Sequence, residues 1–131
     1  MTILINIDVP DLDAAERFYT AAFGLVAGRR IGAGAVELLG WPAPLYLLQK
    51  KAETIGVDGD QRRYMRHWTP VHIDVAVDDL DAALATALGA GARLEQGPQD
   101  AAYGRIAMLG DPYGHGFCLI QFNQHGYDAL I

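Results

Sequence analysis

The fold is decided by a stretch that occurs twice, as Ile7-Asp8-Val9-Pro10-Asp11-Leu12-Asp13-Ala14-Ala15 and as Val75-Ala76-Val77-Asp78-Asp79-Leu80-Asp81-Ala82-Ala83. The offset is 68 residues, and six of the nine positions are identical. Further matches follow at slightly larger offsets: LGWP at 39–42 with LGDP at 109–112, and LLQ at 47–49 with LIQ at 119–121. Self-similarity at a nearly fixed offset predicts two copies of one structural unit.

Each copy carries the same order of secondary-structure signals. Residues 3–9 and 71–77 alternate Ile or Val with polar residues, which predicts a half-buried strand. A helix follows, because an Asp side chain can accept hydrogen bonds from the free N–H groups at a helix start. The candidate caps are Asp11 or Asp13 in the first copy and Asp78, Asp79 or Asp81 in the second. Gly24 ends the first helix, and Gly89 and Gly91 follow the second. Short apolar runs then predict strands at 26–31, 35–39, 45–49, 92–95, 104–109 and 115–122.

These signals predict an α+β fold of two β-α-β-β-β modules within a single domain, residues 1–131. A chain of 131 residues, 51% of them hydrophobic, suits one core. Module one covers about 1–50, a connection covers about 51–69, and module two covers about 70–124. The connection contains Gly56, Gly59 and many charges, and three roles stay open for it: a lid over the site, a segment that docks on a partner subunit, or a plain tether.

Charge argues against a nucleic-acid partner. The net charge is -6 and the isoelectric point is about 4.9, so the chain would repel a phosphate backbone. One basic cluster, Arg62, Arg63, Arg66 and His67, lies beside acidic residues, and we interpret it as a solvated loop rather than an anion site.

Cysteine usage and hydropathy concern the compartment. Cys118 is the single cysteine and cannot form an intrachain disulfide, which suits a reducing compartment. The first residues contain no basic stretch followed by a long apolar run, and no apolar segment approaches the roughly 18 residues that a membrane span needs. We expect a cytoplasmic protein with no membrane partner.

The repeated β-α-β-β-β order, the DLDAA helix opening and the LGDPxG turn before the last strand resemble the vicinal oxygen chelate superfamily. This superfamily includes glyoxalase I, bleomycin resistance proteins and extradiol dioxygenases. The resemblance covers nearly the whole chain and is most specific at 71–83 and 109–122. Residues 66–72, RHWTPVH, also resemble an uncharacterised bacterial glyoxalase-like branch. The resemblance implies a cup-shaped mixed sheet around a small-molecule site, and a homodimer.

Metal-dependent members of the superfamily hold a divalent metal with His and Glu residues on the first and last strands of each module. The corresponding positions here are Leu4, Tyr46, His72 and Cys118. Only His72 has the residue type of the family, since leucine has no lone pair and tyrosine and cysteine bind metals mainly when deprotonated. A divalent metal at His72 is therefore possible, but metal-free function is favoured.

Two pairs of polar residues on the first strands are the leading site candidates. His72 and Asp74 share a strand face, and we interpret them as a catalytic acid/base pair, with a buried structural histidine as the alternative. Asn6 and Asp8 share a face with Leu4, and Asn6 corresponds to Asp74 in the repeat. We expect both to point into the site and bind ligand, the alternative being a solvated outer face.

Further ligand-binding candidates lie elsewhere in the chain. Tyr46, Trp68 and Tyr103 could clamp a flat or apolar ligand, and Arg105 could pair with a carboxylate or phosphate. Cys118 is also a ligand-binding candidate; its apolar run predicts a buried residue rather than a nucleophile, and the family resemblance implies that it lies near His72.

Two functional hypotheses follow. The first is a small-molecule enzyme, a lyase, isomerase or dioxygenase of the glyoxalase-like kind. The second is a metal-free protein that sequesters a drug or metabolite, as bleomycin resistance proteins do.

Overall fold

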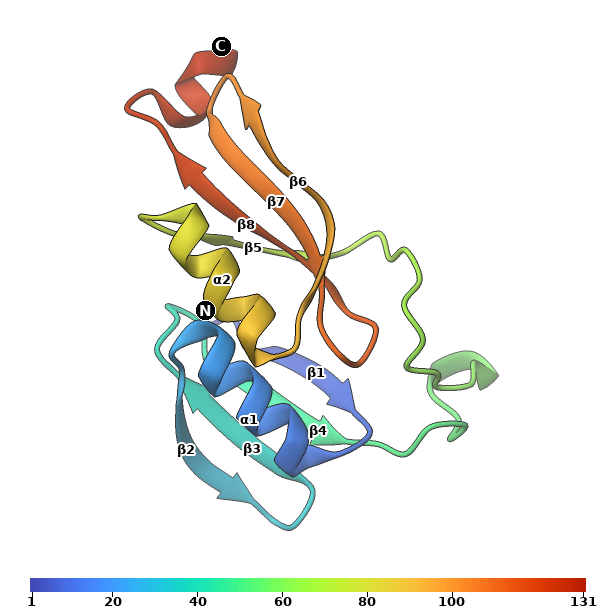
Figure 1. The fold of residues 1–131 in the computed structure, drawn as a ribbon. Coiled ribbons are helices and arrows are strands. Elements are labelled where there is room, and N and C mark those ends of the chain that lie inside the picture. The colour runs from blue at the N-terminus through green and yellow to red at the C-terminus, as the bar shows by residue number, and fades with distance from the viewer. The chain divides into compact units, whose positions relative to one another are not determined.

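A computed structural model describes all 131 residues of the chain. The chain divides into two compact units, Met1–Met65 and Arg66–Ile131, and each contains one β-α-β-β-β module (Figure 1). The first unit contains β1 (Ile5–Val9), α1 (Leu12–Phe23), β2 (Val26–Ile31), β3 (Ala35–Leu39), β4 (Leu45–Gln49) and the 3-10 helix η1 (Val57–Gly59). The second contains β5 (Ile73–Ala76), α2 (Leu80–Ala90), β6 (Arg93–Ala101), β7 (Gly104–Gly110), β8 (Gly116–Phe122) and the 3-10 helix η2 (Gly126–Leu130). The predicted α+β fold of two modules is confirmed.

Both sheets are mixed and have the same topology. The strand orders are β1-β4-β3-β2 and β5-β8-β7-β6. In each sheet the first strand runs parallel to the last, and the other neighbours are antiparallel. Asn6 lies opposite Tyr46, and Asp74 lies opposite Cys118. The sequence repeat is therefore also a repeat of strand register.

Each helix covers one face of its own sheet. Helix α1 packs on β3 and β4, and α2 packs on β7 and β8. In the first unit this face supplies the buried Val9, Val36, Leu38, Leu45 and Leu47, and in the second it supplies Ala107, Leu109, Phe117 and Leu119. Because side chains alternate along a strand, the residues between these point to the opposite face of the sheet. That opposite face is called the open face below, because α1 and α2 pack on the other side of their sheets.

The helix ends follow the sequence signals. Asp11 and Asp79 are the N-caps, and the side chain of each accepts a hydrogen bond of 3.1 Å from the backbone N–H three residues later. Gly24 and Gly91 follow the two helices with positive φ, a conformation that glycine adopts without steric cost. Gly89 lies inside α2 instead of after it.

A glutamine at or near the end of each module's last strand holds the helix start in place. Gln49 Oε1 accepts a hydrogen bond of 2.9 Å from the backbone N–H of Leu12, and Gln121 Oε1 accepts one of 2.8 Å from that of Leu80. These N–H groups belong to the first helical residues and have no partner within the helix. Each glutamine thus joins the first loop of its module to the last strand.

Strand β6 is longer than expected. It continues to Ala101, whereas the sequence predicted a strand at 92–95. The Gln96-Gly97-Pro98 stretch was expected to end it, but the register shifts against β7 at two places and Gly97 takes a φ of +89°. Such bulges let a strand pass through a glycine and a proline without ending.

The connection at 51–69 is divided between the units. Its first part folds onto the first unit, where Arg62 Nε binds Asp8 Oδ2 at 2.9 Å and Tyr64 donates a hydrogen bond to the Lys50 carbonyl. Arg63 lies 3.8 Å from Asp60, so the arginines of the basic cluster form ion pairs within the chain. No helix in the structure has the length and apolar character required to span a bilayer.

The glutamine contacts give a first prediction. We expect Gln121→Ala to lower the free energy of unfolding by about 1–2 kcal/mol, because it leaves a partly buried N–H without a partner. Gln49→Ala should cost a similar amount, since its geometry is the same. Urea titration followed by circular dichroism measures both. Gln124→Ala, at an exposed position, serves as the control. Equal stability of the three variants would contradict the role of the two glutamines.

Candidate functional site

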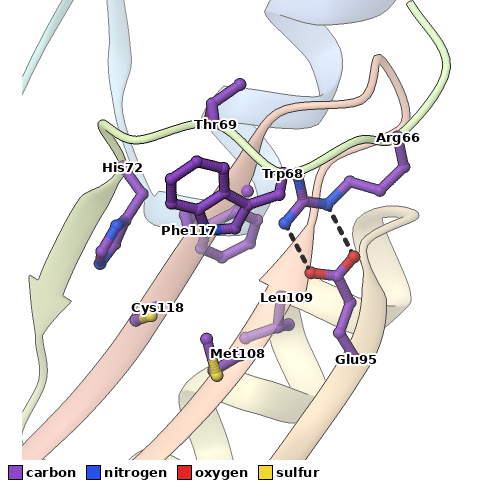
Figure 2. Close-up of a pocket in the computed structure, with 10 residues that line it drawn as sticks. Arg66, Trp68, Thr69, His72, Glu95, Met108, Leu109, Phe117 and Cys118 are labelled. Atoms are coloured by element: carbon purple, nitrogen blue, oxygen red, sulfur yellow. Dashed lines mark hydrogen bonds and ion pairs between the residues drawn. The ribbon is translucent and has the colours of Figure 1, made fainter.

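A small cavity opens on the second unit. Its volume is about 80 Å³, and it is lined by Arg66, Trp68, Thr69, His72, Glu95, Met108, Leu109, Gly116, Phe117 and Cys118. Figure 2 shows the Trp68 ring between His72 on one side and the Arg66–Glu95 pair on the other. The segment 66–69 is called the strap below. The cavity combines an exposed aromatic ring, apolar side chains and one histidine.

His72, Asp74 and Cys118 form a polar cluster at this cavity. His72 Nε2 lies 3.0 Å from Asp74 Oδ1, and the ligand atoms of all three residues lie within 4.8 Å of one another. His72 immediately precedes β5, Asp74 is the second residue of β5, and Cys118 lies opposite Asp74 on β8. His72 and Asp74 are about half exposed, so both can meet a ligand from solvent. The carboxylate can orient the imidazole ring and stabilise its charge during proton transfer.

The thiol of Cys118 is buried and neutral. Its side chain is 3% exposed, as the apolar run predicts. Burial raises the pKa of the Cys118 thiol to about 11, and the Asp74 carboxylate contributes as a negative charge and as a hydrogen-bond acceptor. A thiol with this pKa carries very little thiolate at neutral pH, so Cys118 is a poor nucleophile.

The strap is held by Arg66. Its guanidinium makes two hydrogen bonds to the Glu95 carboxylate, Nε to Oε2 at 2.7 Å and Nη2 to Oε1 at 2.9 Å (Figure 2). It passes directly over Gly110 and Gly116, where a Cβ atom at Gly116 would lie 2.4 Å from Arg66 Nη2. These two glycines leave room for the side chain, which fixes the strap beside the cavity.

The first unit carries a different polar cluster on its open face. Glu37 is 5% exposed, and its carboxylate accepts hydrogen bonds from Arg29 Nη2 at 2.6 Å and from the Tyr46 hydroxyl at 2.8 Å. These two donors, Arg29 first, lower the pKa of Glu37 to about 2. The hydrogen bond to Glu37, together with burial, raises the pKa of Tyr46, so its phenol stays protonated. Both oxygens of the Glu37 carboxylate and the Tyr46 hydroxyl are thus engaged within the network.

The structure brings four of the predicted site residues together: Trp68, His72, Asp74 and Cys118. In the first unit, Asn6 is exposed on the strand beside Tyr46, and Asp8 is engaged by Arg62. Asn6 and Asp8 therefore share the open face with Tyr46, as alternation requires.

Tyr103 and Arg105 lie outside the cavity. Tyr103 packs against Phe122 and Tyr127, with ring centroids 6.3 Å and 5.3 Å away. Arg105 pairs with Asp81 on α2 at 3.1 Å. Alternation along β7 places Arg105 on the helix-covered face, opposite to Met108 at the cavity.

Sequence reasoning missed three acidic residues that bind neighbouring side chains: Glu37, Glu95 and Asp111. Glu37 and Glu95 each interrupt an apolar or strand-forming run, which is a signal that could have marked them. Asp111 also escaped notice: it is buried within the predicted turn and lies 2.7 Å from His115 Nδ1. Glu95 pairs with Arg66, which lies 29 residues away, so no local signal reveals that partner, whereas His115 is only four residues from Asp111.

The four positions used by metal-dependent members of the superfamily do not fit a metal. Leu4 offers no donor and is 54% exposed, and the Tyr46 hydroxyl donates to Glu37. Cys118 binds a metal only as thiolate, and it is 3% exposed. His72 is the one ready ligand, with Asp74 beside it as a second possible donor. We therefore derive no chemistry through a metal.

Comparison with known proteins supports the assignment of two repeated modules to the glyoxalase-like fold. A family model described as a glyoxalase-like domain matches residues 4–120. The anthracycline biosynthesis protein DnrV of Streptomyces peucetius is 31% identical over 122 residues. This match covers 90% of the chain but 40% of DnrV, so the chain spans about two fifths of the length of that relative.

Solved structures share the fold at lower identity. One is a glyoxalase/bleomycin resistance protein/dioxygenase family enzyme from Burkholderia phytofirmans PsJN, 19% identical, with a TM-score of 0.70 over 92% of this chain and 97% of that one. Another is the fosfomycin resistance protein FosX from Listeria monocytogenes, 16% identical, with a TM-score of 0.70 over 95% of each chain. At these identities the likeness concerns the fold alone.

The Cys118 environment gives a second prediction. We expect iodoacetamide to alkylate the folded protein slowly at pH 8, because a thiol pKa of about 11 leaves little thiolate. Asp74→Asn removes the negative charge and should lower that pKa, so alkylation should become a few-fold faster. It should stay slower than in urea, since burial is the largest cause of the shift. Mass spectrometry follows the reaction. Asp78→Asn, at an exposed acid beyond β5, is the matched control, and equal rates in all variants would refute the contribution of Asp74.

The strap gives a third prediction. Gly116→Ala should displace the Arg66 guanidinium and break its ion pair, so the amides of residues 66–69 should exchange hydrogen several-fold faster. The free energy of unfolding should change by less than about 1 kcal/mol, because partly exposed ion pairs contribute little. Mass spectrometry of the peptide that contains the strap measures the exchange. Gly34→Ala, where a Cβ meets nothing within 4 Å, should leave it unchanged.

Proposed function

We propose that this chain, which belongs to the glyoxalase-like domain family, binds a small, flat, apolar or aromatic molecule in the cavity of its second unit without a metal. The proposal rests on one observation: an exposed tryptophan and apolar side chains lie next to the polar pair His72 and Asp74. Small-molecule sites commonly have this composition, with an apolar lining and a few polar groups that fix orientation.

Trp68 supplies the flat surface. Its side chain is 79% exposed although it lines the cavity, so one face of the indole remains available for stacking. Met108 is also partly exposed at the cavity. An exposed aromatic ring next to a thioether suits an aromatic ligand, because both groups are polarisable.

The named relative is consistent with this ligand class. DnrV is named as an anthracycline biosynthesis protein, and anthracyclines are planar polycyclic aromatic compounds. The cavity of about 80 Å³ is small, so such a molecule would place one edge in it and leave the rest against Trp68 or in solvent.

Proton transfer is a second candidate function. It is favoured by the distance of 3.0 Å between His72 Nε2 and Asp74 Oδ1, which orients the imidazole. In this case His72 would move a proton to or from an enol or hydroxyl of the bound molecule, and Asp74 would stabilise the imidazolium. We also infer, from the family resemblance and the unpaired cysteine, that the protein works as a homodimer in the cytoplasm.

Binding of 1,4-dihydroxyanthraquinone tests the proposal. We expect saturable binding, measured through the visible absorbance of the probe, and the same affinity after treatment with EDTA or addition of Zn²⁺ or Mn²⁺. Trp68→Ala should weaken binding about three- to tenfold, the range for loss of one aromatic contact. Trp41→Ala, in the other unit beside Phe23, is the control and should bind as the wild type does.

Three results would overturn parts of this proposal. Absence of saturable binding would refute the ligand class. Binding that requires added metal would refute the metal-free site. Equal weakening by both tryptophan substitutions would place the ligand outside the cavity.

A further inference from the structure

We propose that Asp74 sets the charge preference of the site. The site binds a cationic molecule more tightly than a neutral one, and a neutral molecule more tightly than an anionic one. This inference rests on the proposed function and names the ligand class more closely. Asp74 lies directly beside His72 and Cys118, which line the cavity.

The carboxylate of Asp74 has no fixed cation as its partner. Its contacts are the His72 imidazole at 3.0 Å, which is charged only when protonated, and the neutral Cys118 thiol. On the first strand of the other unit, Asp8 has a different environment, because Arg62 binds it at 2.9 Å. Asp74 therefore keeps a net negative charge next to the cavity.

The arginine at the cavity does not offset this charge. Arg66 is the one Lys or Arg residue in the cavity lining; its Nε and Nη2 atoms donate to Glu95, and its Nη1 donates to the His67 carbonyl. The Arg66–Glu95 pair has no net charge. An anion could bind the Arg66 guanidinium only if the two short hydrogen bonds to Glu95 were broken. An incoming carboxylate, sulfonate or phosphonate would find no free cation in this unit's cavity.

The same negative charge acts on the Cys118 thiol, which lies opposite Asp74 on β8. The Asp74 and Glu95 carboxylates both raise its pKa by their charge, in addition to burial. An anionic ligand beside Cys118 would experience the same repulsion as the thiolate. A cationic group would be attracted to Asp74 and could also lie over the exposed face of Trp68, where a cation–π contact is favourable.

The expected size of the preference follows from Coulomb's law. At the dielectric constant of water, two unit charges about 5 Å apart already change affinity by roughly fourfold, and partial exclusion of solvent strengthens the interaction, so we expect a change of at least roughly five- to tenfold for each unit of ligand charge. The net charge of -6 acts in the same direction at longer range, but salt screens that contribution.

Three anthraquinones of one shape test the inference: 2-(aminomethyl)anthraquinone, 2-(hydroxymethyl)anthraquinone and anthraquinone-2-sulfonate. At pH 8 and 0.15 M salt we expect the affinity to fall in that order, by roughly five- to tenfold at each step. Asp74→Asn should compress the range between the cation and the anion by at least fivefold. Asp78→Asn makes the same change in net charge at an exposed position outside the cavity, and it should keep the order and the spacing of the wild type.

The outcomes separate this inference from the function on which it rests. Binding of none of the three probes would overturn the proposed function itself. Equal binding of all three, or the same compression by Asp74→Asn and Asp78→Asn, would overturn the role of Asp74 and leave the aromatic site in place. Tightest binding of the sulfonate would overturn the charge preference outright.

Discussion

The two units depend on one interaction that each makes in the same way. A glutamine near the end of the last strand accepts a hydrogen bond from the first N–H group of the helix, Gln49 from Leu12 and Gln121 from Leu80. The N-cap aspartate satisfies another N–H of the same helix start, so two otherwise unpaired donors find partners. Because this glutamine lies on the strand that runs parallel to the first one, the contact fixes strand, helix and crossover together. The side chains on the open face of the sheet are placed by this frame.

The repeat supplies equivalent positions, and the two units use them differently. On the open face of the first unit, Tyr46 is opposite Glu37, and both oxygens of the Glu37 carboxylate accept hydrogen bonds within the network with Arg29 and Tyr46. The equivalent position of the second unit has Cys118 opposite Met108, with no acid on that strand. Hydrogen bonds from Arg29 and Tyr46 lower the pKa of Glu37, whereas burial and the nearby Asp74 raise the pKa of the Cys118 thiol. In the first unit the Glu37 carboxylate and its two partners bind one another, whereas in the second unit a histidine and a carboxylate are exposed.

Local signals predicted most of the frame. The strands at 26–31, 35–39 and 45–49 have the bounds that their short apolar runs predicted. The neighbourhood of His72, Asp74 and Cys118 also followed from the repeat and the family resemblance. Arg66 and Glu95 are 29 residues apart, and their pairing depends on two glycines that make space, so no pattern along the chain reveals it. The length of strand β6 was underestimated, because a Gly-Pro pair can mark either a bulge within a strand or the end of a strand.

The position of Asp74 connects the fold to its chemistry. Had the last strand carried a glutamate at the place of Cys118, two carboxylates would face each other across adjacent strands and would need a cation to offset their repulsion. A neutral thiol removes that need, because it can donate a hydrogen bond to Asp74 and adds no charge. Cys118, at one of the positions that hold metal ligands in metal-dependent members of the superfamily, therefore adds no charge that a cation would have to balance. What remains is a single negative charge beside an aromatic surface, which suits recognition of a molecule more than activation of an ion.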